Sequence, residues 1–293
     1  MRWLVATQRR RIKLGVTTAV LSIETRKRSW SVLIVLLSAI VVPLIFNLVI
    51  IPTIPELSPG VFKGLLFSQF YLLACSIFSM TVLGVSTRLK VLLEPPKKPF
   101  LTISLSVFIG LLAAVLAGQI NLIQTIFFGP DDPNGDLRGY LLNLDPGLST
   151  IFRVTFWLLP PMNEELLYRY IAQKQLEIVA GPRVSIMIVA LLFSVSHLSG
   201  TLFVPILFSA LIFGIAFYIT NNWIIASIVH ITHNLPVLYT GIGGMAIQSV
   251  EAQEIFWPGS VLVTIFSVGL LFVSLRGMSK IFLIPSVPQH QDS

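Results

Sequence analysis

Residues 148–176, LSTIFRVTFWLLPPMNEELLYRYIAQKQL, form a long apolar segment with a charged centre. A helix needs about 20 mostly apolar residues to cross the hydrocarbon core of a bilayer, so this stretch predicts a membrane-spanning helix. The Pro160-Pro161 pair interrupts it, and proline is well tolerated in the first turn of a helix. We therefore expect the span to kink, or a helix to restart, just before the charged residues.

The composition of the whole chain extends this prediction to the entire fold. Of 293 residues, 55% are hydrophobic and 11% are charged, which is about half the charge of a soluble domain. The sequence predicts an all-α, polytopic helical bundle in a single membrane domain. The net charge of +7 fits basic cytoplasmic loops, and without an aromatic-interleaved basic patch it does not indicate nucleic-acid binding.

Cys75 is the single cysteine, so neither an intramolecular disulfide nor a cysteine metal cluster is expected.

Eight segments have the length and hydropathy of membrane spans. They are residues 31–54, 65–85, 101–127, 148–176, 184–198, 202–220, 223–240 and 260–275. With this count, the basic loop residues other than Lys63 and Arg138 fall on one side of the membrane, together with the basic amino-terminal segment. Lysine and arginine concentrate in cytoplasmic loops, so both termini are predicted to be cytoplasmic.

The ends of the chain are expected to lie outside the bundle. Residues 1–30 are predicted to form a basic arm on the cytoplasmic membrane surface, residues 31–284 the transmembrane domain, and residues 285–293 a polar tail. The apolar run after the arm is too long for a signal peptide, although a basic, acid-poor start also fits a transit peptide. We expect a multi-pass protein of a bacterial plasma membrane; in a eukaryote, the endoplasmic reticulum or a plastid is expected instead.

Glu164, Glu165 and Arg169 stand in the pattern EExxxR. Ionisable residues inside a membrane span are costly and indicate a functional site. Glu165 and Arg169 lie on one helix face and can pair, whereas Glu164 points about 100° away. The unpaired Glu164 is thus the expected general base, and the paired Glu165 a structural acid. The alternative is a purely structural ion-pair cluster that also includes Lys174.

Two further motifs lie on the apolar segments that follow. Phe193 and His197 are one helical turn apart, so the phenyl ring can pack under the imidazole; a satisfied core histidine is the alternative. His230 and Asn234 have the same spacing, and as two hydrogen-bond donors they can stabilise an oxyanion. His233 is expected to be a packing or supporting residue, because it faces partly away.

In this order, on three successive apolar segments, the three motifs resemble the signature of a known family of intramembrane proteases. That signature is EExxxR, then FxxxH, then HxxxN or HxxxB. It belongs to the CAAX prenyl endopeptidase and bacteriocin-processing family, also called the Abi family. The resemblance covers residues 160–235, and a protease-like core is expected over residues 148–241.

The resemblance implies peptide hydrolysis by a glutamate-activated water, without an acyl-enzyme. Glu164 would activate the water with help from His197. His230 and Asn234 would hold the tetrahedral oxyanion. The implied supporting residues are Glu165, Arg169 and Phe193.

The resemblance also raises the question of zinc, because the family has been described as metal-dependent. Glu164, His197 and His230 could supply three protein ligands, the number usual at a catalytic zinc. The chain has no HExxH motif, which the zincin class requires. A site without a metal or other cofactor is therefore expected, with zinc as the alternative.

The predicted spans contain one conflict. Glu164 lies about 24 Å below the external end of its span, and His197 about 21 Å above the cytoplasmic end of its own. In a hydrocarbon core about 30 Å thick, the two would miss each other by roughly 15 Å. A misplaced boundary of the short fifth span is the expected cause.

The sequence thus predicts an intramembrane endopeptidase whose partners are the lipid bilayer and a membrane-associated protein or peptide substrate. A prenylated CAAX-type carboxyl terminus is one such substrate. The first alternative is a non-proteolytic scaffold or immunity-type protein of the same family, because function depends on the site rather than the fold. The second is a proton-coupled transporter that uses Glu164 and His197 as a relay.

Overall fold

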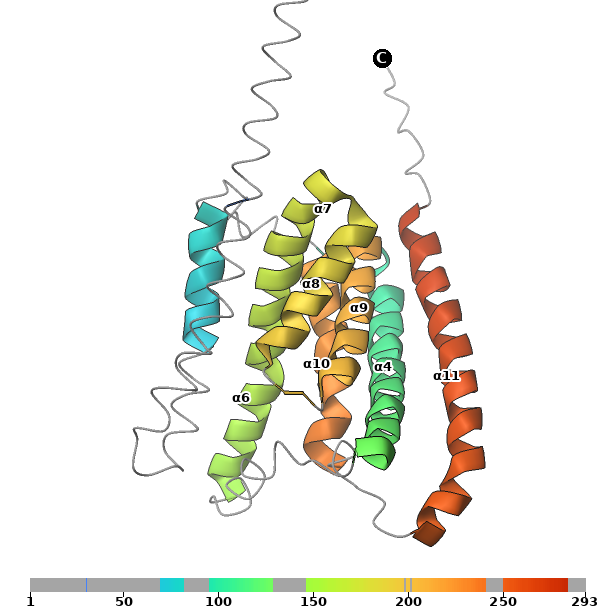
Figure 1. Ribbon diagram of the computed structural model, residues 1–293. Coiled ribbons are helices and arrows are strands. Elements are labelled where there is room, and N and C mark those ends of the chain that lie inside the picture. The colour runs from blue at the N-terminus through green and yellow to red at the C-terminus, as the bar shows by residue number, and fades with distance from the viewer. Residues whose placement is uncertain are drawn as a thin grey trace, which may run out of the picture.

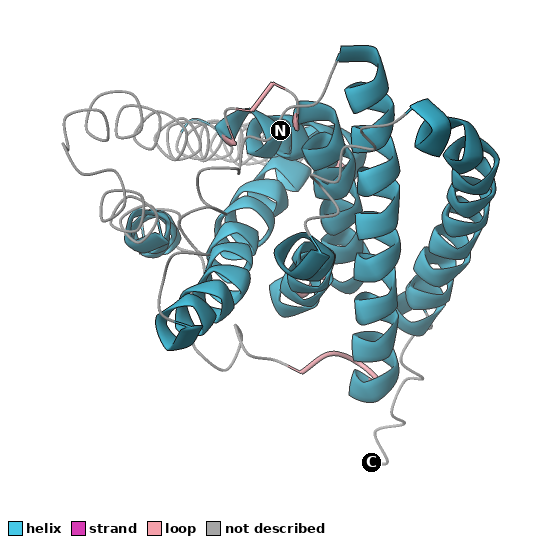
Figure 2. Cartoon of the chain, turned by 90° about the horizontal axis from the view of Figure 1, so that it is seen from below, coloured by secondary structure: helices cyan, strands magenta, loops and turns pink. Residues whose placement is uncertain are grey.

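The computed structural model describes residues 30, 69–81, 95–128, 146–197, 199–200, 202–240 and 250–283. Every regular element in these ranges is a helix, which confirms the predicted all-helical fold (Figure 1; Figure 2 gives the view from below). The first of them is the short helix Gln69–Thr81. The others are α4 (Pro99–Phe128), α6 (Pro146–Glu165), η3 (Leu166–Gln173), α7 (Lys174–Ala180), α8 (Pro182–Ser196), α9 (Phe203–Thr220), α10 (Trp223–Thr240) and α11 (Val250–Leu283).

Three of these helices are long and apolar enough to cross a membrane, as expected of an integral membrane protein. The qualifying stretches are Pro99–Gln124, Phe203–Thr220 and Gly259–Phe282. Residues 1–29 of the predicted arm, the predicted span 31–54 and the tail 285–293 lie outside the described residues. The count of eight spans, the cytoplasmic termini and the domain boundaries therefore stay predictions.

The helix that carries the glutamates continues without a break from Pro146 to Ala180, through α6, η3 and α7. It passes through both Pro160 and Pro161, so the expected restart of a helix at this pair is wrong. The change comes later, at Leu166, where the backbone widens into the π-helix η3, whose eight residues are all buried. π-helical segments are rare in proteins, and those that do occur are often found at functional sites.

A sharp reversal at Gly181 sets the relative level of the EExxxR and FxxxH motifs. Gly181 ends α7 with φ 75°, a conformation that glycine adopts without steric cost. Pro182 then begins α8 at a position where its missing N–H is no loss. Since Glu164 lies 17 residues before Gly181 and His197 lies 16 residues after it, the hairpin brings both to a similar level. The predicted gap came from placing Glu164 relative to the external end of its span at residue 148; the continuous helix Pro146–Ala180 is longer than a hydrocarbon core about 30 Å thick requires.

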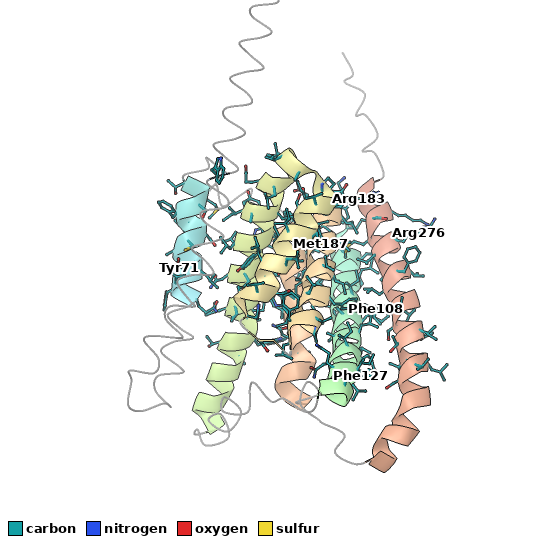
Figure 3. The ribbon with its side chains drawn as sticks, in the orientation of Figure 1. Tyr71, Phe108, Phe127, Arg183, Met187 and Arg276 are labelled. Carbon is teal, nitrogen blue, oxygen red and sulfur yellow. The ribbon has the colours of Figure 1, made fainter. Side chains whose placement is uncertain are left out.

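The helix α10 lies between α6 and α4 and also contacts α9 (Figure 1). The indole nitrogen of Trp157 donates a hydrogen bond of 2.6 Å to the Ile231 carbonyl and joins α6 to α10. Large apolar side chains on the outer faces of α4 and α8, among them Phe108, Phe127 and Met187 (Figure 3), are exposed. Such a surface is expected where helices face lipid tails rather than water.

Gly110 of α4 lies directly against the backbone of α10. A Cβ atom at Gly110 would lie 2.5 Å from the Val229 carbonyl oxygen and 2.8 Å from Cβ of Thr232. Val229 immediately precedes His230. The absence of a side chain at position 110 therefore allows α4 to support the part of α10 that carries the HxxxN motif.

We expect Gly110→Ala to destabilise the folded protein by about 1–3 kcal/mol, the usual cost of overpacking a core. The added methyl group must push α10 away, because its nearest neighbour is backbone rather than a flexible side chain. Thermal unfolding in detergent measures the effect. Gly269→Ala on α11, where nothing lies within 4 Å, is the matched control and should not lose stability. Equal unfolding temperatures for the two variants would contradict this account.

Candidate active site

The two neighbouring glutamates have different surroundings. Glu165 is completely buried, and its Oε2 accepts a hydrogen bond of 2.9 Å from Nε of the equally buried Arg169. Its Oε1 lies 3.0 Å from Nδ1 of His230. Glu164 is 16% exposed, and its nearest recorded ionisable contact is Nε2 of His230, 3.9 Å from Oε2. The predicted Glu165–Arg169 pair is therefore present, and His230 joins it from a distant helix.

The imidazole of His230 lies between the two carboxylates. Its ring stacks on Phe213 of α9 with centroids 4.3 Å apart and an interplanar angle of 22°, which fixes the ring plane. A carboxylate oxygen only accepts hydrogen bonds, so the contact with Glu165 places a proton on Nδ1. A donor role for Nε2 therefore requires both nitrogens of the ring to carry protons.

His197 follows α8 directly and its side chain is exposed. Its Nδ1 lies 2.8 Å from the carbonyl oxygen of Phe193. Because a carbonyl only accepts, Nδ1 carries a proton and, in the neutral ring, Nε2 keeps its lone pair. The buried Phe193 ring lies 4.6 Å from the ring of His197 and 5.7 Å from that of His230. One phenyl ring thus lies between His197 and His230, and His230 in turn contacts the glutamates.

Asn234 is held by His233, for which the sequence predicts only a packing or supporting role. Nδ1 of His233 lies 2.9 Å from Oδ1 of Asn234, and its Nε2 lies 2.8 Å from Oγ of Ser209 on α9. With Oδ1 accepting from His233, the amide nitrogen of Asn234 keeps both of its N–H groups for another acceptor. Sequence reasoning missed Ser209 and Phe213, which share one face of α9.

Zinc was the alternative considered for Glu164, His197 and His230. The hydrogen bonds from Nδ1 of His230 to Glu165 and from Nδ1 of His197 to the Phe193 carbonyl leave Nε2 of both rings available, so they do not by themselves decide against a metal. Within the described ranges, no three His, Cys, Asp or Glu side chains are arranged to hold a metal ion. A metal-free reaction stays a prediction, and no step below is routed through a metal.

Comparison with known protein families gives a match to the segment that carries the three motifs. Residues 146–236 match the model of the family described as type II CAAX prenyl endopeptidase Rce1-like. The matched segment begins with α6 and ends within α10, so it contains all three motifs. No curated protein and no solved structure matches the chain. The resemblance indicated by the motifs is thus confirmed for this segment, which is similar to the Rce1-like type II CAAX prenyl endopeptidases.

Proposed function

We propose that the protein is an intramembrane endopeptidase in which Glu164 activates a water molecule for attack on a peptide bond. The observation that carries the proposal is the contrast between the two glutamates. Glu165 is buried and bonded on both oxygens, whereas Glu164 is partly exposed beside His230. A general base must be within reach of the water whose proton it takes, and of the two only Glu164 combines exposure with a free carboxylate.

The proposed reaction needs no covalent enzyme intermediate. Glu164 takes a proton as the water oxygen bonds to the carbonyl carbon, and His197 supports the water through the lone pair on Nε2. The oxyanion forms against Nε2–H of His230 and the amide of Asn234, since donors aimed at developing charge stabilise it most. The carbon–nitrogen bond then breaks, and the proton held by Glu164 passes to the leaving amine.

The distribution of basic residues supports the predicted cytoplasmic side. Arg183 at the start of α8 and Arg276 in α11 lie toward one end of the bundle, and Phe127 lies at the other (Figure 3). Lys97 and Lys98 directly precede α4, which ends near Phe127. Basic residues on one side match the cytoplasmic bias of membrane proteins. A prenylated CAAX carboxyl terminus, as named for the matched family, is our proposed substrate class.

The test is peptide cleavage by the purified full-length protein in detergent. A prenylated CAAX peptide is compared with the same peptide without the lipid and with a small set of other carboxyl-terminal peptides, each with and without a chelator. Cleavage that survives the chelator and prefers the prenylated peptide is the expected result. If a folded protein cleaves none of them, the proposal is wrong, and a scaffold or immunity-type role becomes the better explanation.

His233 is proposed to act as a positioning residue that orients the amide of Asn234. We expect His233→Ala to lower kcat, with little change in KM, because substrate binding does not need this contact. The loss should not exceed about 10²-fold, the cost of a misplacement of roughly 1 Å in an active site. Steady-state kinetics on the best peptide provide the measurement.

A double variant separates positioning from general damage. If His233 acts only through Asn234, then His233→Ala should cost nothing further in an Asn234→Ala background, since residues that act as a unit are non-additive. Ser209→Ala, which removes the hydroxyl next to His233 Nε2, should give a smaller loss of the same kind. Fully additive losses would show that His233 does not work through Asn234.

A further inference from the structure

A line of polar side chains leads away from the candidate site along the glutamate helix. Glu165, Arg169, Gln173 and Glu177 recur at every fourth position. The first three are completely buried, whereas Glu177 in α7 is half-buried. The first pair is joined by the Arg169–Glu165 bond of 2.9 Å. The last pair is joined by a bond of 3.0 Å from Nε2 of Gln173 to Oε1 of Glu177.

The line has one interruption, between Arg169 and Gln173. Within the described part of the chain, Nη1 and Nη2 of Arg169 and Oε1 of Gln173 are buried without a hydrogen-bond partner. The orientation of the Gln173 amide is set by its other atom, because Nε2 donates to both Glu177 and the Gly214 carbonyl. Oε1 must therefore be the atom that is left without a donor.

The two groups without partners reach the same place beside α9. A Cβ atom at Gly214 would lie 3.0 Å from Oε1 of Gln173 and 3.7 Å from Nη1 of Arg169. Glycine at this position keeps that place free of a side chain. Buried polar atoms in native proteins nearly always have a partner, and where protein groups supply none, an ordered water or ion is the usual explanation.

We infer that a water molecule binds between Arg169 and Gln173 beside Gly214, joining a guanidinium N–H to the amide oxygen. The two partners decide the chemistry of the ligand. An anion would satisfy the guanidinium but be repelled by the amide oxygen, and a cation would be repelled by Arg169. Water accepts from one partner and donates to the other, as buried waters with two or more polar partners do.

With this water in place, the hydrogen-bonded line is continuous from Glu165, which also holds His230, to the half-buried Glu177. The water then gives Nη1 a hydrogen-bond partner in a guanidinium that is otherwise bonded only through Nε. An unsatisfied donor on a buried charged group is costly. The site goes beyond the proposed hydrolysis and does not depend on whether the protein cleaves peptides.

The test is a crystal or electron cryo-microscopy structure of the full-length protein at a resolution that shows ordered water. We expect density within hydrogen-bond distance of both Arg169 Nη1 and Gln173 Oε1. A direct Arg169–Gln173 hydrogen bond with no such density would overturn the inference. This result alone decides the question, even if every variant fails to fold.

A matched pair of variants adds a second measurement. The methyl group of Gly214→Ala would lie 3.0 Å from Gln173 Oε1 and 3.2 Å from Cγ2 of Ile186, so it should displace the water and lower the unfolding temperature. Gly269→Ala has nothing within 4 Å and should keep both the density and the unfolding temperature. Persistence of the density in Gly214→Ala would mean that it does not arise from the site described.

Discussion

Glu164→Gln is expected to abolish peptide cleavage while leaving the thermal stability of the protein unchanged. Glutamine keeps the shape of the side chain but cannot take a proton from water. General-base catalysis contributes roughly 10²–10⁴-fold to a rate, which would bring a modest intramembrane activity below detection. Stability should not fall, because Glu164 is partly exposed and its nearest recorded ionisable contact is 3.9 Å away.

The neighbouring variant Glu165→Gln provides the matched comparison. We expect its main effect to be on thermal stability rather than on cleavage. Glu165 accepts from both Arg169 and His230, so its replacement leaves two buried cationic or donor groups facing a neutral amide. Hydrogen bonds to charged groups are worth more than neutral ones, and thermal unfolding should detect their loss. Cleavage rates and unfolding curves of both variants in one detergent make the comparison.

Two results would contradict the assignment. If Glu164→Gln keeps wild-type cleavage, Glu164 is not the base and the proposed mechanism fails. If Glu164→Gln unfolds as readily as Glu165→Gln, the two carboxylates contribute equally to the stability of the fold. In that case the ion-pair cluster considered from the sequence is the better explanation of the EExxxR motif.

Local spacing was the part of the site that the sequence could predict. The Glu165–Arg169 bond and the packing of Phe193 against His197 each join residues four positions apart, within a helix or at its end, and helix geometry alone brings such residues together. The sequence could not predict that His230 reaches Glu165 from 65 positions away. Contacts of this kind depend on which helices become neighbours, and hydropathy carries no information about that.

The course of the backbone through α6, η3 and α7 was also only partly predictable from the sequence. A proline pair inside a helix removes hydrogen bonds and predicts a break, yet α6 continues through Pro160 and Pro161. In membrane helices, neighbouring groups can satisfy the carbonyls that proline leaves unbonded. The reversal at Gly181-Pro182 did have a sequence signal. Hydropathy alone placed the span boundaries at residues 176 and 184 instead.

Gly110 shows where similarity to a family stops being informative. The residues matched to the family model are 146–236, whereas Gly110 lies on α4 outside them. Its close contact with the Val229 carbonyl supports α10 immediately before His230. A segment containing only the three motifs would therefore lack one of the surfaces that hold the HxxxN motif in place.

Arg169→Met is expected to cause the largest loss of stability of any single change considered, about 3–5 kcal/mol. That is the usual cost of removing one partner from a buried ion pair. Arg169 is completely buried, bonded through Nε to Glu165, and its Cζ lies 5.3 Å from the centre of the Phe193 ring. Methionine fills similar space along the helix but leaves Glu165 buried with His230 as its remaining partner.

Arg183→Met is the matched control, because it makes the same substitution at an exposed arginine near the start of α8 (Figure 3). Exposed substitutions usually change stability by about 0.5 kcal/mol or less, so only the buried variant should unfold at a markedly lower temperature in detergent. Arg169→Lys should recover little, since an ammonium lacks the planar fork of the guanidinium. If Arg169→Met and Arg183→Met unfold at the same temperature, the Glu165–Arg169 pair does not stabilise the helix. The two glutamates would then have to be distinguished by their exposure alone.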